Sequence, residues 1–267
     1  MDGGWETVEV KHEQVIDRNP RTWINSACEK QNNGDYSGAL KDLQQAREFS
    51  VGDEDLIFLC DLDEIIVHYK AGTKSKARKV QARYANNMRM FREYFLYDMN
   101  MLISFLKTDE TAWQRSLHDV AKELLVNRHS FEKVITLLPF LDAVWLAQQV
   151  TASCMKEIIL QDEIKLFIVL RQGGYPLASF KTDSGANVTM LAAYASNYQK
   201  YILEDVLRQG LNDIDASDND GWSALDYEIQ NHSGKAVDML LANHANVNRS
   251  NEEDITPLMH ACHPEDF

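Results

Sequence analysis

A repeated motif in the last third of the chain constrains the fold more than any other feature of the sequence. Segments that start at residues 189, 223 and 256 align with one another, and each carries a leucine at its third position. These residues, Leu191, Leu225 and Leu258, are 34 and 33 residues apart. A repeat of this length is one supersecondary unit, and such units bury their apolar faces by stacking on their neighbours. The sequence therefore predicts an array of units.

A second pattern with a similar period supports the first. Apolar residues stand seven, four and three places before Gly173, Gly210 and His244, so each set shares one face of a short helix. We expect these three residues to end the helices. Glycine adopts the left-handed conformation without a Cβ clash, and the Asn-rich segment around His244 is a tolerable substitute. The repeat is therefore predicted to consist of short helices joined by turns.

The unit from Asp218 to Asn248, DNDGWSALDYEIQNHSGKAVDMLLANHANVN, resembles a complete ankyrin repeat, with Gly234 between its two helices. Residues 184–216 resemble a second unit, and residues 151–183 resemble a more degenerate first one. The resemblance implies a stack of helix pairs in which the loops between repeats and the concave face bind other proteins.

Two features depart from the ankyrin pattern. Glu228 and Tyr194 occupy a position at which this family usually has alanine. The sequence therefore does not predict close helix packing at these two positions. The unit that begins at Asn251 has a first helix and no second helix before Phe267. From this unfinished unit we expect the natural protein to continue beyond the given sequence.

Residues 21–49 resemble a tetratricopeptide unit. The positions that this family fills with Trp, a small residue, Gly, Tyr, Ala, a large apolar residue and Ala hold Trp23, Ala27, Gly34, Tyr36, Ala39, Leu43 and Ala46. We expect Asn and Gly in the central turn to end one helix and Asp35 to cap the next. Ser26 and Val51 depart from the family, which has leucine and proline there.

The remaining segments also predict helices. Residues 108–126 place their apolar side chains on one stripe, and residues 130–150 are expected to form two short helices because Pro139 interrupts them. The predicted fold class is all-α with a helical-repeat, α-solenoid architecture. The predicted parts are an irregular lead at 1–20, a tetratricopeptide-like helical domain at 21–150 and about three ankyrin repeats at 151–267.

Composition excludes several classes of protein. Only five prolines and twelve glycines argue against a β-rich fold, and four cysteines without a CxxC pair are typical of a reducing compartment. A net charge of -14 makes general DNA binding unlikely, because the field repels phosphate. No apolar run is long enough to predict a membrane span, and we expect a cytoplasmic protein.

The closing segment TPLMHACHPEDF holds His260, Cys262 and His263 within four residues. A zinc site needs three or four converging ligands, and no second cluster completes one. In the repeat alignment Cys262 takes a small-residue position of a first helix, where a thiol packs like alanine. No nucleophile, phosphate-binding or metalloprotease motif occurs. We therefore expect no catalytic residue, no metal and no cofactor, and no enzyme activity in this chain.

Residues 70–92 carry eight Lys or Arg and no Asp or Glu. They belong to a second, weaker hairpin expected over residues 53–91, in which Gly72 and Ala77 repeat the spacing of the first hairpin. A basic patch for an acidic partner, a lipid head group or RNA would consist of Lys74, Lys76, Arg78, Lys79 and Arg83. The alternative, which we favour, is that this helix pairs with the acidic residues of 51–64.

The loops between the ankyrin-like units give the stronger functional hypothesis. Loops on a rigid stack carry recognition, and acidic loops steer basic partners. The expected partner-binding residues are Asp218, Asn219, Asp220, Trp222, Tyr227, Asn231, Arg249, Glu252 and Glu253. The combination of the two repeat types also resembles adaptor proteins and ankyrin-type effectors that bacteria deliver into the host cytosol. The alternative is the targeting region of a larger enzyme whose catalytic domain follows Phe267.

Overall fold

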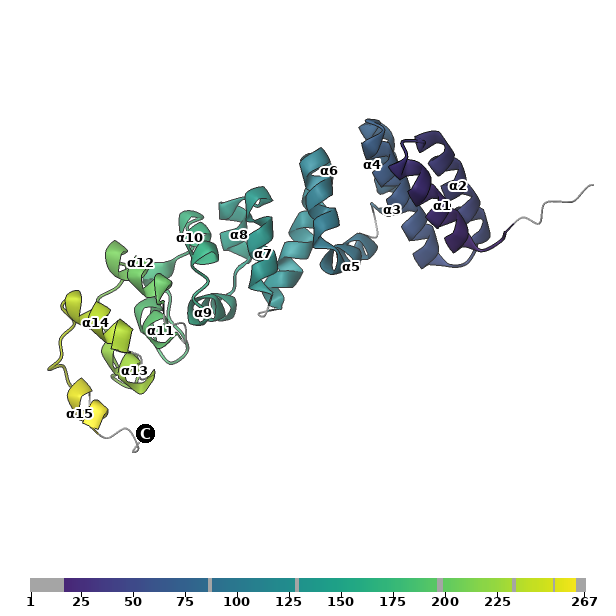
Figure 1. The fold of residues 1–267 in the computed structure, drawn as a ribbon. Coiled ribbons are helices and arrows are strands. Elements are labelled where there is room, and N and C mark those ends of the chain that lie inside the picture. The colour runs from purple at the N-terminus through teal and green to yellow at the C-terminus, as the bar shows by residue number, and fades with distance from the viewer. Residues whose placement is uncertain are drawn as a thin grey trace, which may run out of the picture. The chain divides into compact units, whose positions relative to one another are not determined.

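The computed structural model describes residues 17–85, 88–127, 130–195, 199–231, 234–251 and 253–262. Over these ranges the chain forms fifteen α-helices, three short 3₁₀ helices and no β-strand, which confirms the predicted all-α class (Figure 1). Within the same ranges, each helix is too short or too polar to cross a membrane. The chain divides into two compact units, unit 1 ending at Glu93 and unit 2 beginning at Tyr94.

Unit 1 is a series of helices in which each packs on the next, α1 on α2, α2 on α3 and α3 on α4. Its elements are α1 (Pro20–Asn32), α2 (Tyr36–Phe49), α3 (Glu54–Lys70), α4 (Lys74–Gln81), η1 (Ala82–Tyr84) and the first part of α5 (Arg89–Tyr97). The side chains of Asn19, Asp35 and Asp53 each accept a hydrogen bond from a backbone N–H in the first turn of α1, α2 and α3. The predicted cap at Asp35 is therefore confirmed.

The first hairpin of unit 1 packs as its sequence predicts. Its buried small and apolar side chains are Ala27, Ala39, Leu43 and Ala46. Gly34 has a φ of +81° in the turn, a conformation that glycine adopts without strain. At the departure from the tetratricopeptide pattern, Ser26 Oγ donates to Asp42 at 2.6 Å and ties α1 to α2. Gly72, with a φ of +70°, and the fully buried Ala77 repeat this arrangement between α3 and α4.

Unit 2 contains the remaining helices. They are α6 (Met99–Val126), α7 (Phe131–Leu137), η2 (Leu138–Phe140), α8 (Ala143–Gln149), α9 (Ala152–Leu160), α10 (Ile164–Gln172), η3 (Leu177–Ser179), α11 (Val188–Tyr194), α12 (Tyr201–Gln209), α13 (Ala224–Asn231), α14 (Gly234–Ala242) and α15 (Pro257–Cys262). Asp109 interrupts α6 with non-helical φ and ψ values of -153° and 71°, close to the predicted helix start. Pro139 lies in η2 and separates α7 from α8, as predicted.

In the second half of unit 2, helices that alternate along the chain are neighbours in space. Helix α11 packs on α9 and on α13, and α13 packs on α15, while α10 contacts α12 (Figure 1). The intervening helices α12 and α14 pack on α11 and α13. Helices α9, α11, α13 and α15 are therefore in contact one after another, and α12 and α14 pack beside α11 and α13.

The three predicted helix ends differ in detail from the expectation. Gly210 and His244 have positive φ values of 60° and 67°, as expected for left-handed helix ends. Gly173 ends α10 with a φ of -74°, and the left-handed residue is Gly174 with a φ of +84°. The prediction for Gly173 was wrong in this respect. Its lack of a side chain serves close packing instead, because a Cβ there would collide with the carbonyl oxygen of Ala143.

The predicted joint near Thr151 lies inside unit 2. Thr151 caps α9, its Oγ1 accepting a hydrogen bond from the N–H of Cys154 at 3.2 Å. A chain can divide into compact units at one residue and change its type of repeat at another, so the division at Glu93 does not test the predicted joint. The boundary between tetratricopeptide-like and ankyrin-like parts therefore stays a prediction.

Candidate functional site

The loop that precedes α13 is held in shape by one carboxylate. Asp218 is only 9% exposed, and its Oδ1 accepts hydrogen bonds from the backbone N–H groups of Asp220 at 3.0 Å and Trp222 at 2.8 Å. Its Oδ2 accepts from the hydroxyl of Tyr227 at 2.8 Å. The side chain of Asp218 therefore folds its own loop and fastens it to α13.

Hydrogen bonds join this loop to the loops that precede α11 and α15. Asn219 donates from its backbone N–H to Ser184 O at 2.9 Å and from Nδ2 to Asp183 O at 3.1 Å. Arg249 donates from Nη1 to Gly221 O at 3.0 Å and from Nη2 to Ser217 Oγ. We call the residues 182–186, 217–222 and 249–251 with 253–255 the tip loops. The three tip loops form a connected row.

Exposed carboxylates lie on and beside the tip loops. They are Asp183, Asp213, Asp220, Glu253 and Asp254. Residues 183–254 contain thirteen Asp and Glu and four Lys and Arg, so this segment alone has a net charge of -9.

All four cations of residues 183–254 already have partners in the described structure. Lys200 bonds Glu228, Arg208 bonds Asp205, and Lys235 donates to the carbonyl oxygen of Gln199. Arg249, the fourth, is used between the tip loops. The exposed carboxylates of the row therefore create a negative surface potential.

A row of aromatic side chains lies beside the tip loops. Tyr194 at the end of α11 is 41% exposed, and its ring is perpendicular to that of Tyr227 on α13, with centroids 6.0 Å apart and an interplanar angle of 84°. Trp222 makes a similar contact with Tyr227 at 6.1 Å. The other neighbour of Trp222 is His260 of α15, whose ring centroid is 4.9 Å away. We call Tyr194, Tyr227 and Trp222 the aromatic row.

The electrostatics of Tyr227 connect the aromatic row to the tip loops. Burial raises the pKa of Tyr227 to about 12, and the hydrogen bond to Asp218 and the charges of Asp218 and Asp220 add to this effect. The charge of Asp220 makes the smallest of these contributions, and it acts on the hydroxyl of Tyr227. Because the hydroxyl is committed to Asp218, Tyr227 offers a partner its ring rather than its oxygen.

Two buried polar pairs connect the helices that carry this surface. Lys200 and Glu228 are both fully buried, with Nζ 3.3 Å from Glu228 Oε2 and donating to the carbonyl oxygens of Ala193 and Ala195. This pair explains one departure from the ankyrin pattern, because Glu228 has a charged partner where alanine would pack.

The second buried pair joins α13 to α15. His260 Nδ1 lies 3.0 Å from Asp226 Oδ1. Oδ2 of the same aspartate accepts hydrogen bonds from Ser223 at the start of α13. His260 therefore has a packing role. The expectation that Cys262 packs like alanine was wrong, because its side chain is exposed on α15.

The structure distributes the predicted partner-binding residues over different environments. Asp220 and Glu253 are exposed on the tip loops, and Tyr227 and Trp222 are partly buried. Asp218, Asn219 and Arg249 make the hydrogen bonds within and between loops described above, so they shape the surface. Asn231 donates from Nδ2 to Ala195 O at 3.4 Å. Glu252 lies outside the described residues.

Tyr194 and Asp183 belong to this surface and were not among the predicted partner-binding residues. Tyr194 was noticed only as a departure from alanine, and that departure is the signal that could have found it. An aromatic residue that replaces a packing alanine is either accommodated in the core or exposed, and here it is exposed. Asp183 could have been found by aligning residues 182–186 with the tip loop at 217–222.

The basic patch of unit 1 is partly paired, as the favoured interpretation predicts. Arg83 Nη1 lies 2.8 Å from Asp61 Oδ1 and 3.4 Å from Glu64 Oε2, and Arg47 binds the same two carboxylates. Exposed side chains of α4 are Lys74, Lys76, Arg78 and Lys79. Internal pairing is therefore shown for Arg83, and α4 also presents cations to solvent.

Two other features were considered as sites. In the described part of the chain, no three His, Cys, Asp or Glu side chains form a group that could hold a metal ion. His263, one member of the closing His and Cys cluster, lies outside that part.

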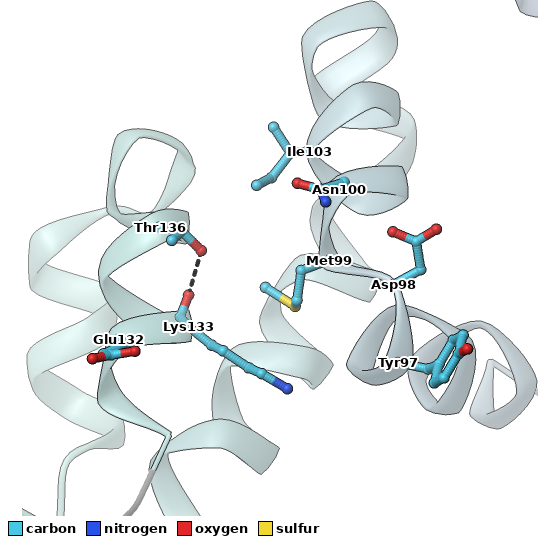
Figure 2. Close-up of a pocket in the computed structure, with 8 residues that line it drawn as sticks. All are labelled: Tyr97, Asp98, Met99, Asn100, Ile103, Glu132, Lys133 and Thr136. Atoms are coloured by element: carbon cyan, nitrogen blue, oxygen red, sulfur yellow. Dashed lines mark hydrogen bonds between the residues drawn. The ribbon is translucent and has the colours of Figure 1, made fainter.

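A shallow groove of about 320 Å³ lies between the start of α6 and α7 (Figure 2). Met99 and Ile103 give it an apolar side, while Glu132 and Lys133 carry opposite charges on α7. Lys133 Nζ also donates to Leu96 O at 3.4 Å. The lining of this groove includes the exposed ring of Tyr97, but it has no row of contacting aromatic rings like the one beside the tip loops.

Comparison with known proteins gives no match for this chain, either to a protein-family model or to a curated protein sequence. Functional conclusions therefore depend on the residues and their geometry.

Proposed function

We propose that this chain is a non-catalytic protein-binding module whose residues 151–267, within unit 2, are a stack of ankyrin-like helix pairs. Contacts at the repeat spacing support the stack. Arg171 with Asp205, Ala178 with Asn212, and Asp226 with His260 are hydrogen-bonded pairs, each 34 residues apart. Bonds between equivalent parts of successive units are what a repeat array requires.

The burial of the repeated leucines also supports the stack. Leu191 and Leu225 are each 4% exposed, whereas Leu258 is 71% exposed. Leu191 lies on α11, on which α13 packs, and Leu225 lies on α13, on which α15 packs. We also assign the paired helices of unit 1 to the tetratricopeptide-like type. The buried alanines of these helices and the left-handed glycines at their turns support this assignment.

The observation that carries the binding function is the row of tip loops. Their backbones are hydrogen-bonded to one another through Asn219 and Arg249, so exposed side chains on them have fixed relative positions. A surface ordered before binding loses less conformational entropy when a partner docks. The tip loops with the aromatic row, in a segment of net negative charge, suit a protein partner with a basic surface. We propose an adaptor or scaffold role for such a module. We propose a cytoplasmic location because the four cysteines include no CxxC pair and form no disulfide in the structure.

A crosslinking pull-down with matched charge variants tests this function. The test variant is Asp220→Ser with Glu253→Ser, which removes two exposed tip-loop carboxylates and leaves the structural Asp218 in place. The control is Glu204→Ser with Asp238→Ser, which removes the same charge from exposed positions on α12 and α14. We expect the test variant to lose partners that the control retains. Identical partner sets for the test variant and the unchanged protein would refute the assignment of the surface.

A further inference from the structure

The aromatic row and its charge surroundings define the chemistry of the partner more narrowly. The rings of Tyr194 and Tyr227 are perpendicular and 6.0 Å apart, so together they form two walls of a corner. Tyr194 is 41% exposed and sits at the C-terminal end of α11. The carbonyl oxygens at this helix end are already bonded to Lys200, so the attraction for a cation comes from the faces of the aromatic rings.

None of the four cations of residues 183–254 is free to occupy this corner. Lys200, Arg208, Lys235 and Arg249 all have the partners described above. Asp220 is exposed on the adjoining tip loop, and its charge acts on Tyr227. The corner thus combines π-faces with an uncompensated carboxylate.

We propose that the corner between Tyr194 and Tyr227 receives a lysine or arginine side chain from an extended segment of the partner protein. The cation packs on the ring faces, and Asp220 is its counter-ion. Trp222 positions Tyr227 through its edge contact and is itself backed by His260. This inference rests on the proposed function, since it names the chemistry of the partner at the same surface.

Binding of synthetic peptides to the full chain tests the inference. The probe is a short fluorescent peptide of Gly, Ser and Arg, compared with the same peptide carrying citrulline, which keeps the shape of arginine without its charge. Fluorescence anisotropy gives the dissociation constant at low and at high salt. We expect binding of the arginine peptide that weakens with salt, and much weaker binding of the citrulline peptide.

Protein variants separate recognition in the corner from general attraction to an acidic protein. Tyr194→Ala should weaken binding of the arginine peptide about two- to fivefold, and Tyr194→Phe, which keeps the ring, should restore it. Asp220→Asn should weaken binding and reduce its salt dependence, whereas Asp238→Asn, an equal charge change on α14, should have little effect. A thermal melt confirms that each variant is folded.

Three results would overturn the inference: equal affinity for the citrulline peptide, no effect of Tyr194→Ala, or equal effects of Asp220→Asn and Asp238→Asn. Such results leave the proposed function standing if the tip-loop variant still loses partners in the pull-down. Failure of that pull-down would remove the proposed function as well. The two conclusions can therefore fail separately.

Discussion

At the scale of single residues, the most unusual feature is a lysine with no solvent exposure. Lys200 has a left-handed backbone with a φ of 55°, and its Nζ is surrounded by two carbonyl oxygens at the end of α11 and by Glu228. Burying a charge costs free energy unless it is paired and hydrogen-bonded. Each member of the pair therefore depends on the other.

Removing one member of this pair should destabilise the protein more than removing both. Lys200→Met leaves the Glu228 carboxylate buried without its cation, and we expect a loss of about 3–5 kcal/mol in the free energy of unfolding. Glu228→Leu alone should also be costly, and the double variant should lose less than Lys200→Met alone. Urea unfolding of the four proteins measures these values. Additive losses would show that the two charges are not coupled.

Sequence reasoning found half of this pair. Glu228 was identified because it breaks a family pattern, but the pattern does not name the group that compensates it. Lys200 lies 28 residues earlier. The partner of Glu228 can be identified only from the three-dimensional structure, in which α11 and α13 lie side by side.

At the scale of elements, the local signals in the sequence were the reliable ones. Asp35 caps α2, Pro139 separates α7 from α8, and Gly210 ends α12 in the left-handed conformation. Each of these features depends on a few neighbouring residues. Gly173 was misinterpreted because its role is tertiary: it allows the C-terminus of α10 to approach the backbone of Ala143.

Two glycine substitutions distinguish these roles. Gly173→Ala should destabilise unit 2 because the new Cβ collides with the carbonyl oxygen of Ala143, forcing backbone to move. Gly210→Ala has open space around it but a φ of 60°, so it should cost only about 1 kcal/mol of backbone strain. Denaturant unfolding should rank Gly173→Ala as the more damaging of the two. The reverse order would contradict the packing role of Gly173.

At the scale of the whole molecule, the sequence predicted an all-helical chain and the spacing of its repeated motif, because periodicity and turn residues are local. It did not predict which loop side chains would be exposed. Asp218 and Asp220 are two residues apart and chemically identical, yet one folds the loop and the other faces solvent. That difference depends on the contact of Asp218 with Tyr227, which lies nine residues further along. The candidate surface therefore needed the structure.

The most direct test of the central claim, that the tip loops and the aromatic row bind a protein, is site-specific photo-crosslinking in cells. A photoreactive phenylalanine analogue replaces Tyr194 in one version of the chain and Asp238 in the other, since both side chains are exposed. We predict a protein adduct from position 194 that is absent from position 238 and disappears when Asp220→Ser and Glu253→Ser are added. No adduct at position 194, or the same adducts from both positions, would contradict the claim.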